Sequence, residues 1–226
     1  MSRGDRIPPL ALPAGAGLPA IAVAAIGHRL ATGRSALPDP DDLPLELRRW
    51  GASFVTLERR GRLLGCIGTL EARRPLGIDV AANGLGAAFR DPRFPPLSVR
   101  DYCLMDVEVS VLSPPVPLPV GSFEDLRRRL RPGVDGVLVE APGHRATFLP
   151  SVWATLPGVD DFLGHLWRKG GLVPGAWPGG VTVATYSATV HHAAGPRPAP
   201  IDARVTTVPL ARPSAPTRGG GWRMGT

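Results

Sequence analysis

Hydrophobic and polar positions repeat along the chain with two periods, which predict both helices and strands. Apolar residues three and four positions apart are typical of one buried helix face, and a serine ahead of such a run with an aspartate three residues later is typical of a helix N-cap. These signals predict helices at residues 18–31, 75–90, 123–131, 150–154 and 159–169.

Strand signals lie between these helices. Residues 106–113 alternate strictly, with Val107, Val109 and Val111 on one side of the segment and polar residues on the other. Two further pairs of apolar runs are joined by short glycine-containing turns, which indicates hairpins. The expected strands are 54–57, 62–70, 106–113, 137–140, 145–149 and 181–190. We therefore predict an α+β fold of antiparallel hairpins packed by helices.

Composition divides the chain into a domain and two flanking segments. Residues 1–16 lack periodicity and are expected to form a disordered leader, residues 17–190 form the domain, and the Pro/Arg/Gly-rich residues 191–226 are expected to be a disordered tail. Prolines and glycines interrupt the uncharged run of residues 7–27, which argues against a continuous apolar helix or a membrane span. We expect a cytoplasmic protein.

The charge of the chain is unevenly distributed. The formal net charge is +7, and Lys169 is the only lysine among 26 basic residues. With abundant Ala, Gly and Pro, this arginine bias is typical of a GC-rich bacterium and carries little functional information. Five arginines and one aspartate give residues 191–226 a net charge of +4. Such a tail suits nucleic acid or an acidic partner, although no nucleic-acid-binding motif accompanies it.

Cys66 is the clearest candidate for chemistry. It lies between Gly65 and Gly68 on a predicted strand, and glycine within a strand indicates a bulge or the close approach of another backbone or a ligand. Cys66 is either a reactive or ligating thiol or a small buried apolar residue. Cys103, the other cysteine, is far away in sequence and has no metal-type spacing. No metal site and no cofactor motif are predicted.

Two further segments hold candidate site residues. Rigid prolines keep Asp91 and Arg93 close together, so Arg93 either grips an anion in a cleft or forms an internal ion pair with Asp91. Glu108 is on the polar side of the predicted strand 106–113. It either faces the same cleft as Cys66 or belongs to a solvated strand face.

Several ordered blocks of the chain resemble one family. They are Leu64-Gly65-Cys66-Ile67-Gly68, Asp91-Pro92-Arg93-Phe94-Pro95-Pro96, residues 107–113, Asp135-Gly136-Val137, residues 146–150, Phe162-Leu163, Lys169-Gly170-Gly171-Leu172 and Trp177. In this order and spacing they resemble the AMMECR domain family over roughly residues 20–190. The family has an arginine where this chain has Leu64, so any role of that arginine is absent here.

The resemblance implies a fold, a site and partners. It implies a larger and a smaller lobe around a cleft, with Cys66 and Glu108 as candidate catalytic residues. The candidate substrate-binding residues are Gly65, Gly68, Asp91 and Arg93. Bacterial members resemble protein A of the AmmeMemoRadiSam system, which implies a radical SAM protein and a Memo-like protein as partners.

Three functional hypotheses follow. In the first, the protein is a component of an AmmeMemoRadiSam-type system and binds a substrate in its cleft. In the second, it is an enzyme with Cys66 as nucleophile and Glu108 or His144 as proton donor or acceptor. In the third, it is a nucleic-acid-binding or adaptor module that uses its basic tail. Whether the protein is an enzyme stays open at this stage.

Overall fold

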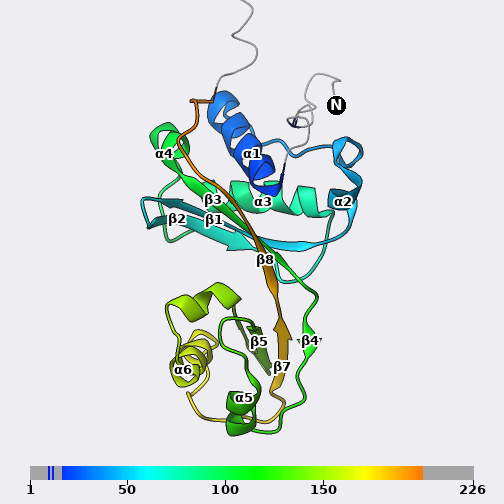
Figure 1. Ribbon diagram of the computed structural model, residues 1–226, viewed down its shortest axis with the longest axis vertical. Helices are drawn as coiled ribbons and strands as arrows, with labels where there is room; N and C mark the ends of the chain where they lie inside the picture. The colour runs from blue at the N-terminus through cyan, green and yellow to red at the C-terminus, as the bar shows by residue number, and fades with distance from the viewer. Residues whose placement is uncertain (1–9, 11, 13–16, 201–226) are drawn as a thin grey trace, which may run out of the picture.

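The protein folds into a larger and a smaller lobe, each built on a four-stranded antiparallel sheet (Figure 1). The computed structural model describes residues 10, 12 and 17–200. The strand order is β2-β1-β3-β8 in the large lobe and β4-β7-β5-β6 in the small lobe. The α+β fold class and the antiparallel hairpins expected from the sequence are confirmed.

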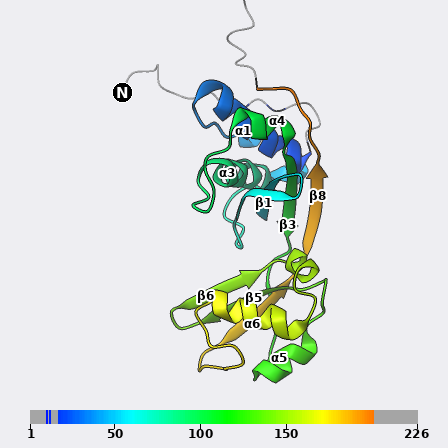
Figure 2. The ribbon, with the colours of Figure 1, turned by 90° about the vertical axis from the view of Figure 1, so that its left-hand side faces the viewer.

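In the large lobe, two helices cover one face of the sheet. Helix α3 lies against β1 and β2, and α1 lies against α3, β3 and β8 (Figure 2). The elements are α1 (Leu18–Thr32), η1 (Pro40–Asp42), α2 (Leu45–Arg48), β1 (Ala52–Arg59), β2 (Arg62–Gly68), α3 (Leu76–Phe89), α4 (Val99–Leu104), β3 (Asp106–Leu112) and β8 (Ala188–Ala193). Of these, the short helices η1, α2 and α4 were not expected.

The small lobe contains the second predicted hairpin and the most aromatic part of the core. Helix α6 packs on β6 and α5, and η2 packs on β5. The elements are β4 (Val116–Pro117), α5 (Phe123–Arg129), β5 (Gly136–Ala141), β6 (His144–Phe148), η2 (Pro150–Ala154), α6 (Val159–Lys169) and β7 (Thr182–Tyr186). Trp153 stacks on Phe162 with ring centroids 3.7 Å apart, which fixes η2 against α6.

The expected strand 181–190 is wrong as a single element. It consists of β7 and β8, which belong to different sheets and meet at Ser187. Ser113, which follows β3, accepts a hydrogen bond from Ser187 N at its Oγ and donates one from its own N to Ser187 O. Two chain segments therefore cross between the lobes side by side, and hydrogen bonds join them at the crossing.

Parts of both flanking segments are ordered. Leu10 of the expected leader is only 4% exposed, lies in the core and donates its N–H to Leu37 O. His191–Ala193 of the expected tail complete β8, and Arg197 donates to Tyr102 O and lies over its ring. These residues have contacts that their local sequence did not indicate: Leu10 bonds to Leu37, β8 pairs with β3, and Arg197 bonds to α4. Residues 1–9, 11 and 13–16 of the leader, and residues 201–226 of the tail, lie outside the described residues.

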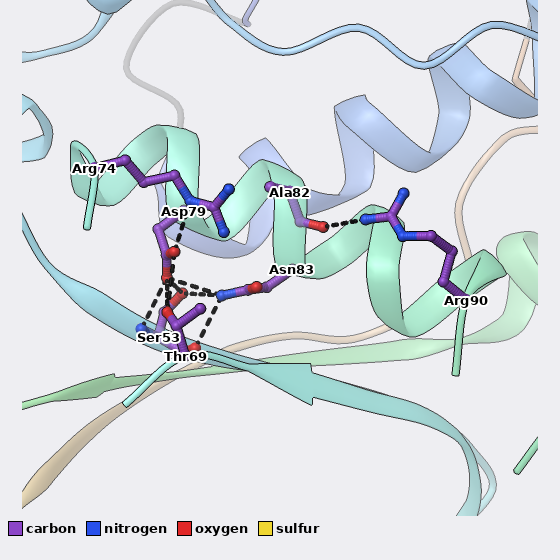
Figure 3. A network of polar contacts seen from close by, with 7 residues as sticks. All are labelled: Ser53, Thr69, Arg74, Asp79, Ala82, Asn83 and Arg90. Carbon is purple, nitrogen blue, oxygen red and sulfur yellow. Dashed lines mark hydrogen bonds and ion pairs between the residues drawn. The ribbon is translucent and has the colours of Figure 1, made fainter. Parts of the chain in front are cut away.

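A buried carboxylate joins α3 to the sheet of the large lobe (Figure 3). Asp79 is fully buried, and its oxygens accept hydrogen bonds from Ser53 N and Oγ on β1, from Thr69 Oγ1 and from Asn83 Nδ2. Arg74 Nε adds an ion pair at 2.8 Å. A buried charge is tolerated when it is paired and fully hydrogen-bonded, so this network holds the sheet and helix in one register.

Candidate functional site

Four polar or reactive side chains form a row across the large sheet. Strand register pairs Cys66 with Thr56, Thr56 with Glu108, and Glu108 with His192. Thr56 Oγ1 donates to Cys66 Sγ at 3.3 Å, and His192 Nε2 lies 3.7 Å from Glu108 Oε2. Directly paired residues on antiparallel strands point to the same face. The row thus brings together the two candidate catalytic residues.

The row is on the sheet face opposite the helices. Val55 and Leu57, the neighbours of Thr56 on β1, are fully buried in the core formed with α1 and α3. Because side chains alternate along a strand, Thr56 and its partners point away from the helices. Ser110 shares this face and donates its hydroxyl to Glu108 Oε1 at 3.3 Å. The alternation predicted for residues 106–113 is confirmed.

The Cys66 thiol is held in its neutral form. Partial burial raises its pKa above the ordinary value, while the hydrogen bond from Thr56 and the charge of Arg93 lower the pKa. The charges of Asp91 and Glu108 raise it. Burial dominates, so the resting site presents a thiol rather than a thiolate at neutral pH.

Asp91 and Arg93 clamp the backbone at the thiol. Asp91 Oδ2 accepts a hydrogen bond from Cys66 N at 2.9 Å, and Arg93 Nη2 donates to Cys66 O at 3.1 Å. Arg93 Nε and Nη2 also donate to the two oxygens of Asp91, at 2.9 and 2.7 Å. These hydrogen bonds hold the pKa of Asp91 well below its usual range. The internal ion pair is present, while 57% of the Arg93 side chain stays exposed.

Gly65 and Gly68 have packing reasons to be glycine. A Cβ at Gly65 would lie 2.9 Å from the carbonyl carbon of Ala87 on α3 and closer still to its oxygen. A Cβ at Gly68 would lie 2.5 Å from Cδ2 of Phe54. The lack of a side chain therefore allows α3 to pack closely on Gly65 and the Phe54 ring to pack closely on Gly68. Their role in substrate binding stays a prediction.

Lys169 is an exposed small-lobe residue whose pKa depends on two groups of this site. At the end of α6, its Nζ donates to Thr147 O at 2.9 Å and lies 5.1 Å from the centroid of the Phe148 ring. Burial lowers its pKa, the Cys66 thiolate would raise it, and Arg93 lowers it. Two groups of the large lobe are therefore within electrostatic reach of this amine. Lys169 was missed as a site residue, although its being the only lysine was a usable signal.

A cavity of about 540 Å³ opens between the lobes beside Glu108. Its lining is mostly apolar and comes from both lobes. The lining residues are Ser110, Pro132, Gly133, Leu149, Pro150, Ser151, Trp153, Ala154, Pro157, Ala188 and Val190. Since Ser110 also bonds Glu108, the cavity adjoins the polar row. Its volume is within the range of small-molecule sites.

Other sequence candidates have partners outside the row. His144 Nδ1 is 2.7 Å from Gly170 O, a contact that ties the second hairpin to the end of α6. Cys103, the other cysteine, is on α4. No group of three His, Cys, Asp or Glu among the described residues is arranged to hold a metal. Within the same part of the chain, no helix has the length and apolarity needed to cross a bilayer.

Comparison with known proteins identifies the family. The family model described as AMMECR1 matches residues 19–191, most of the chain. The chain belongs to the AMMECR1 family. A protein of Methanothermobacter thermautotrophicus is 44% identical over 168 residues, which are 74% of this chain and 86% of the relative. Protein PF1979 of Pyrococcus furiosus is 38% identical over 68% of this chain and 75% of its own length.

A solved AMMECR1-type structure has the same fold. The crystal structure of the uncharacterized protein PH0010 from Pyrococcus horikoshii superposes with a TM-score of 0.73. The two proteins are 33% identical, and the match covers 80% of this chain and 91% of the other. The predicted family is confirmed. These relatives come from archaea, and the bacterial source indicated by composition stays a prediction.

Glu108→Gln should make Cys66 more reactive. The charge of Glu108 raises the pKa of the thiol, so its loss should increase the thiolate fraction and speed alkylation by about two- to fivefold at pH 8. The measurement is the rate of iodoacetamide incorporation at Cys66, read by peptide mass spectrometry. Cys103 in the same sample is the internal control. An unchanged or slower rate at Cys66 would contradict the assigned electrostatics.

Proposed function

We propose that this AMMECR1 protein is the substrate-binding component of an AmmeMemoRadiSam-type modification system and binds a small polar substrate between its lobes. The proposal that the protein binds a substrate rests on one observation. The row of Cys66, Thr56, Glu108 and His192 lies on the sheet face that the helices do not cover. The system itself is inferred from the family, whose bacterial members the chain resembles in its ordered sequence blocks.

The chemistry of the site suits a polar molecule with an apolar part. Glu108 offers a carboxylate that accepts hydrogen bonds, and Arg93 offers a guanidinium that is more than half exposed. The adjoining cavity offers mostly apolar walls. A ligand with its polar end at the row and its apolar end in the cavity would use both surfaces.

A second candidate is a thiol-dependent enzyme with Cys66 as nucleophile. The row supports it, because a thiol with a raised pKa needs a base, and the Glu108 carboxylate faces the same side on a nearby strand. In that reaction the Cys66 sulfur would bond to an electrophilic carbon while its proton passes to Glu108. The neutral resting thiol favours the binding role over this one, since the thiolate is the nucleophile.

The nucleic-acid hypothesis gains no support from the described residues. Arg197, the first arginine of the basic tail, packs on Tyr102 and donates to backbone oxygen. The other tail arginines lie outside the described residues. This hypothesis stays a prediction, and the purification experiment below includes an arm for it.

Affinity purification of the tagged protein from its native host tests the proposed function. We expect a radical SAM protein and a Memo-like protein to copurify in equal amounts with and without nuclease. The Cys66→Ala variant should be purified in parallel. It should retain these partners if the thiol contacts the substrate and is not needed to bind the partner proteins. Recovery of only ribosomal or DNA-bound proteins, lost on nuclease treatment, would contradict the proposal and favour the basic tail.

A further inference from the structure

A second cavity lies in the large lobe and is separate from the cavity between the lobes. It has a volume of about 300 Å³ and forms where the end of the β1–β2 hairpin meets residues 94–98 and the start of α4 (Figure 1). Three arginines line it, Arg59, Arg62 and Arg100, together with one carboxylate, Asp101. None of the described residues lines both cavities. The proposed function therefore makes no use of this second cavity.

The charges around this cavity do not balance. Three arginines and one aspartate give its lining a net charge of +2. The carboxylate is already occupied, because one oxygen of Asp101 pairs with Arg59 and the other accepts a hydrogen bond from Ser98 Oγ at 2.6 Å. Arg62 and Arg100 are exposed, and within the described part of the chain neither has an ion pair or a side-chain hydrogen bond. Two guanidinium groups at one cavity thus lack a counter-charge.

The remaining walls of the cavity are apolar and held in place by the backbone. Leu97 is 6% exposed and donates its N–H to Ala88 O of α3 at 2.7 Å. Phe94 donates its N–H to Asp91 O at 3.2 Å. Two consecutive prolines lie between these anchors, and proline has a fixed φ. Residues 94–97 therefore form a wall with little conformational freedom, as is typical of a preformed ligand site.

We propose that this cavity binds a small phosphate monoester, with the phosphate at Arg62 and Arg100 and the apolar body of the ligand against Phe94 and the two prolines. The planar fork of a guanidinium matches the oxygens of a phosphate. A phosphate monoester has close to two negative charges at neutral pH, which matches the net charge of the lining. The volume is at the lower end of the range for small-molecule sites, so a ligand of one ring and one phosphate has the expected size.

Electrostatics and burial both contribute to this binding. Two cations that border the same small volume repel each other, and a bound anion removes that repulsion. An apolar ring against Phe94 and the prolines is withdrawn from water, which adds to the affinity. The site uses neither Cys66 nor Glu108 and needs no partner protein. The purification experiment above and the binding experiment below can therefore fail independently.

Calorimetric titration of the purified full-length protein with phenyl phosphate tests the proposal. We expect saturable binding that weakens as salt is added, because the two arginines are exposed. Arg62→Gln and Arg100→Gln should each weaken binding by about tenfold, the effect of losing one charged hydrogen-bond donor. Neither side chain has a partner among the described residues, so both variants should keep the wild-type fold, which circular dichroism checks.

Arg168→Gln is the matched control variant, since Arg168 is exposed on α6 in the small lobe. It should bind phenyl phosphate as the wild-type protein does. No saturable binding of phenyl phosphate would overturn the proposal. Binding that Arg62→Gln and Arg100→Gln weaken no more than Arg168→Gln does would overturn it as well, because the ligand would then bind elsewhere on the chain.

Inorganic phosphate and phenol are the matched control probes, since each has only one part of phenyl phosphate. Both should bind about tenfold more weakly than phenyl phosphate, because inorganic phosphate lacks the buried ring and phenol lacks the charge. Inorganic phosphate that binds as tightly as phenyl phosphate would overturn the assignment of the apolar wall. Phenol that binds as tightly would overturn the role of the two arginines.

Discussion

Asp79→Ala should lower the free energy of unfolding by about 3–5 kcal/mol, the range for removing one partner of a buried, hydrogen-bonded ion pair. The carboxylate accepts hydrogen bonds from β1, from the segment after β2 and from α3 itself. Its loss would leave the buried N–H and hydroxyl of Ser53 without their acceptor, and Arg74 without its ion pair. Asn83 would lose one acceptor and keep its hydrogen bond to Ser53 O. Urea unfolding followed by tryptophan fluorescence or circular dichroism measures the change.

Two further variants separate the network from a general effect of losing an aspartate. Asp41→Ala removes a carboxylate that is 93% exposed and 3.7 Å from Arg48, and it should change stability by less than about 0.5 kcal/mol. Asp79→Asn keeps the shape but places an amide donor among groups that donate, so it should still destabilise by about 2 kcal/mol. A fully stable Asp79→Asn would contradict the need for the charge.

Gly65→Ala should be comparably damaging, at about 3 kcal/mol or more, because a methyl group there meets backbone rather than a movable side chain. The new Cβ would lie against the Ala87 carbonyl of α3, so either the helix or β2 must move. Since Cys66 follows directly, the displacement should also alter alkylation of the thiol. Unfolding free energy and the Cys66 alkylation rate are the two readouts.

Gly121→Ala is the control for this substitution. Nothing lies within 4 Å of a Cβ at Gly121, and its backbone is outside the left-handed region. Its stability should stay within about 0.5 kcal/mol of the wild-type protein. A Gly65→Ala protein as stable as Gly121→Ala would show that α3 and β2 are not as closely packed as described.

Local periodicity predicted most of the elements but not how they combine. The alternation of residues 106–113 specified β3 because one side of it is buried against α1 and α3. The run 181–190 is rich in β-branched residues and was predicted as one strand, yet Ser187 divides it between two sheets. The local sequence did not reveal that division, because both strands are half-exposed. The change from one pairing strand to another depends on contacts between segments that are far apart in the sequence.

The site could be predicted only in part for the same reason. Cys66 and Glu108 were recognisable by residue type and family resemblance, but the register that joins them through Thr56 depends on three strands meeting. His192 was assigned to the tail because its neighbours are proline-, arginine- and glycine-rich. Asp79 had a visible signal, an acidic residue within the apolar run of α3, which indicates either a buried partner or a kink.

Cross-linking of Cys66 to Lys169 tests most directly whether the site is a cleft shared by the two lobes. A short reagent with one thiol-reactive and one amine-reactive end has few choices in this chain, which has two cysteines and one lysine. We predict an intramolecular link between Cys66 and Lys169, found by peptide mass spectrometry and lost in Cys66→Ala and in Lys169→Arg. A link from Lys169 to Cys103 alone would contradict a site built from both lobes. Labelling of Cys66 by the thiol-reactive end of the reagent, without any link from it to Lys169, would contradict it as well.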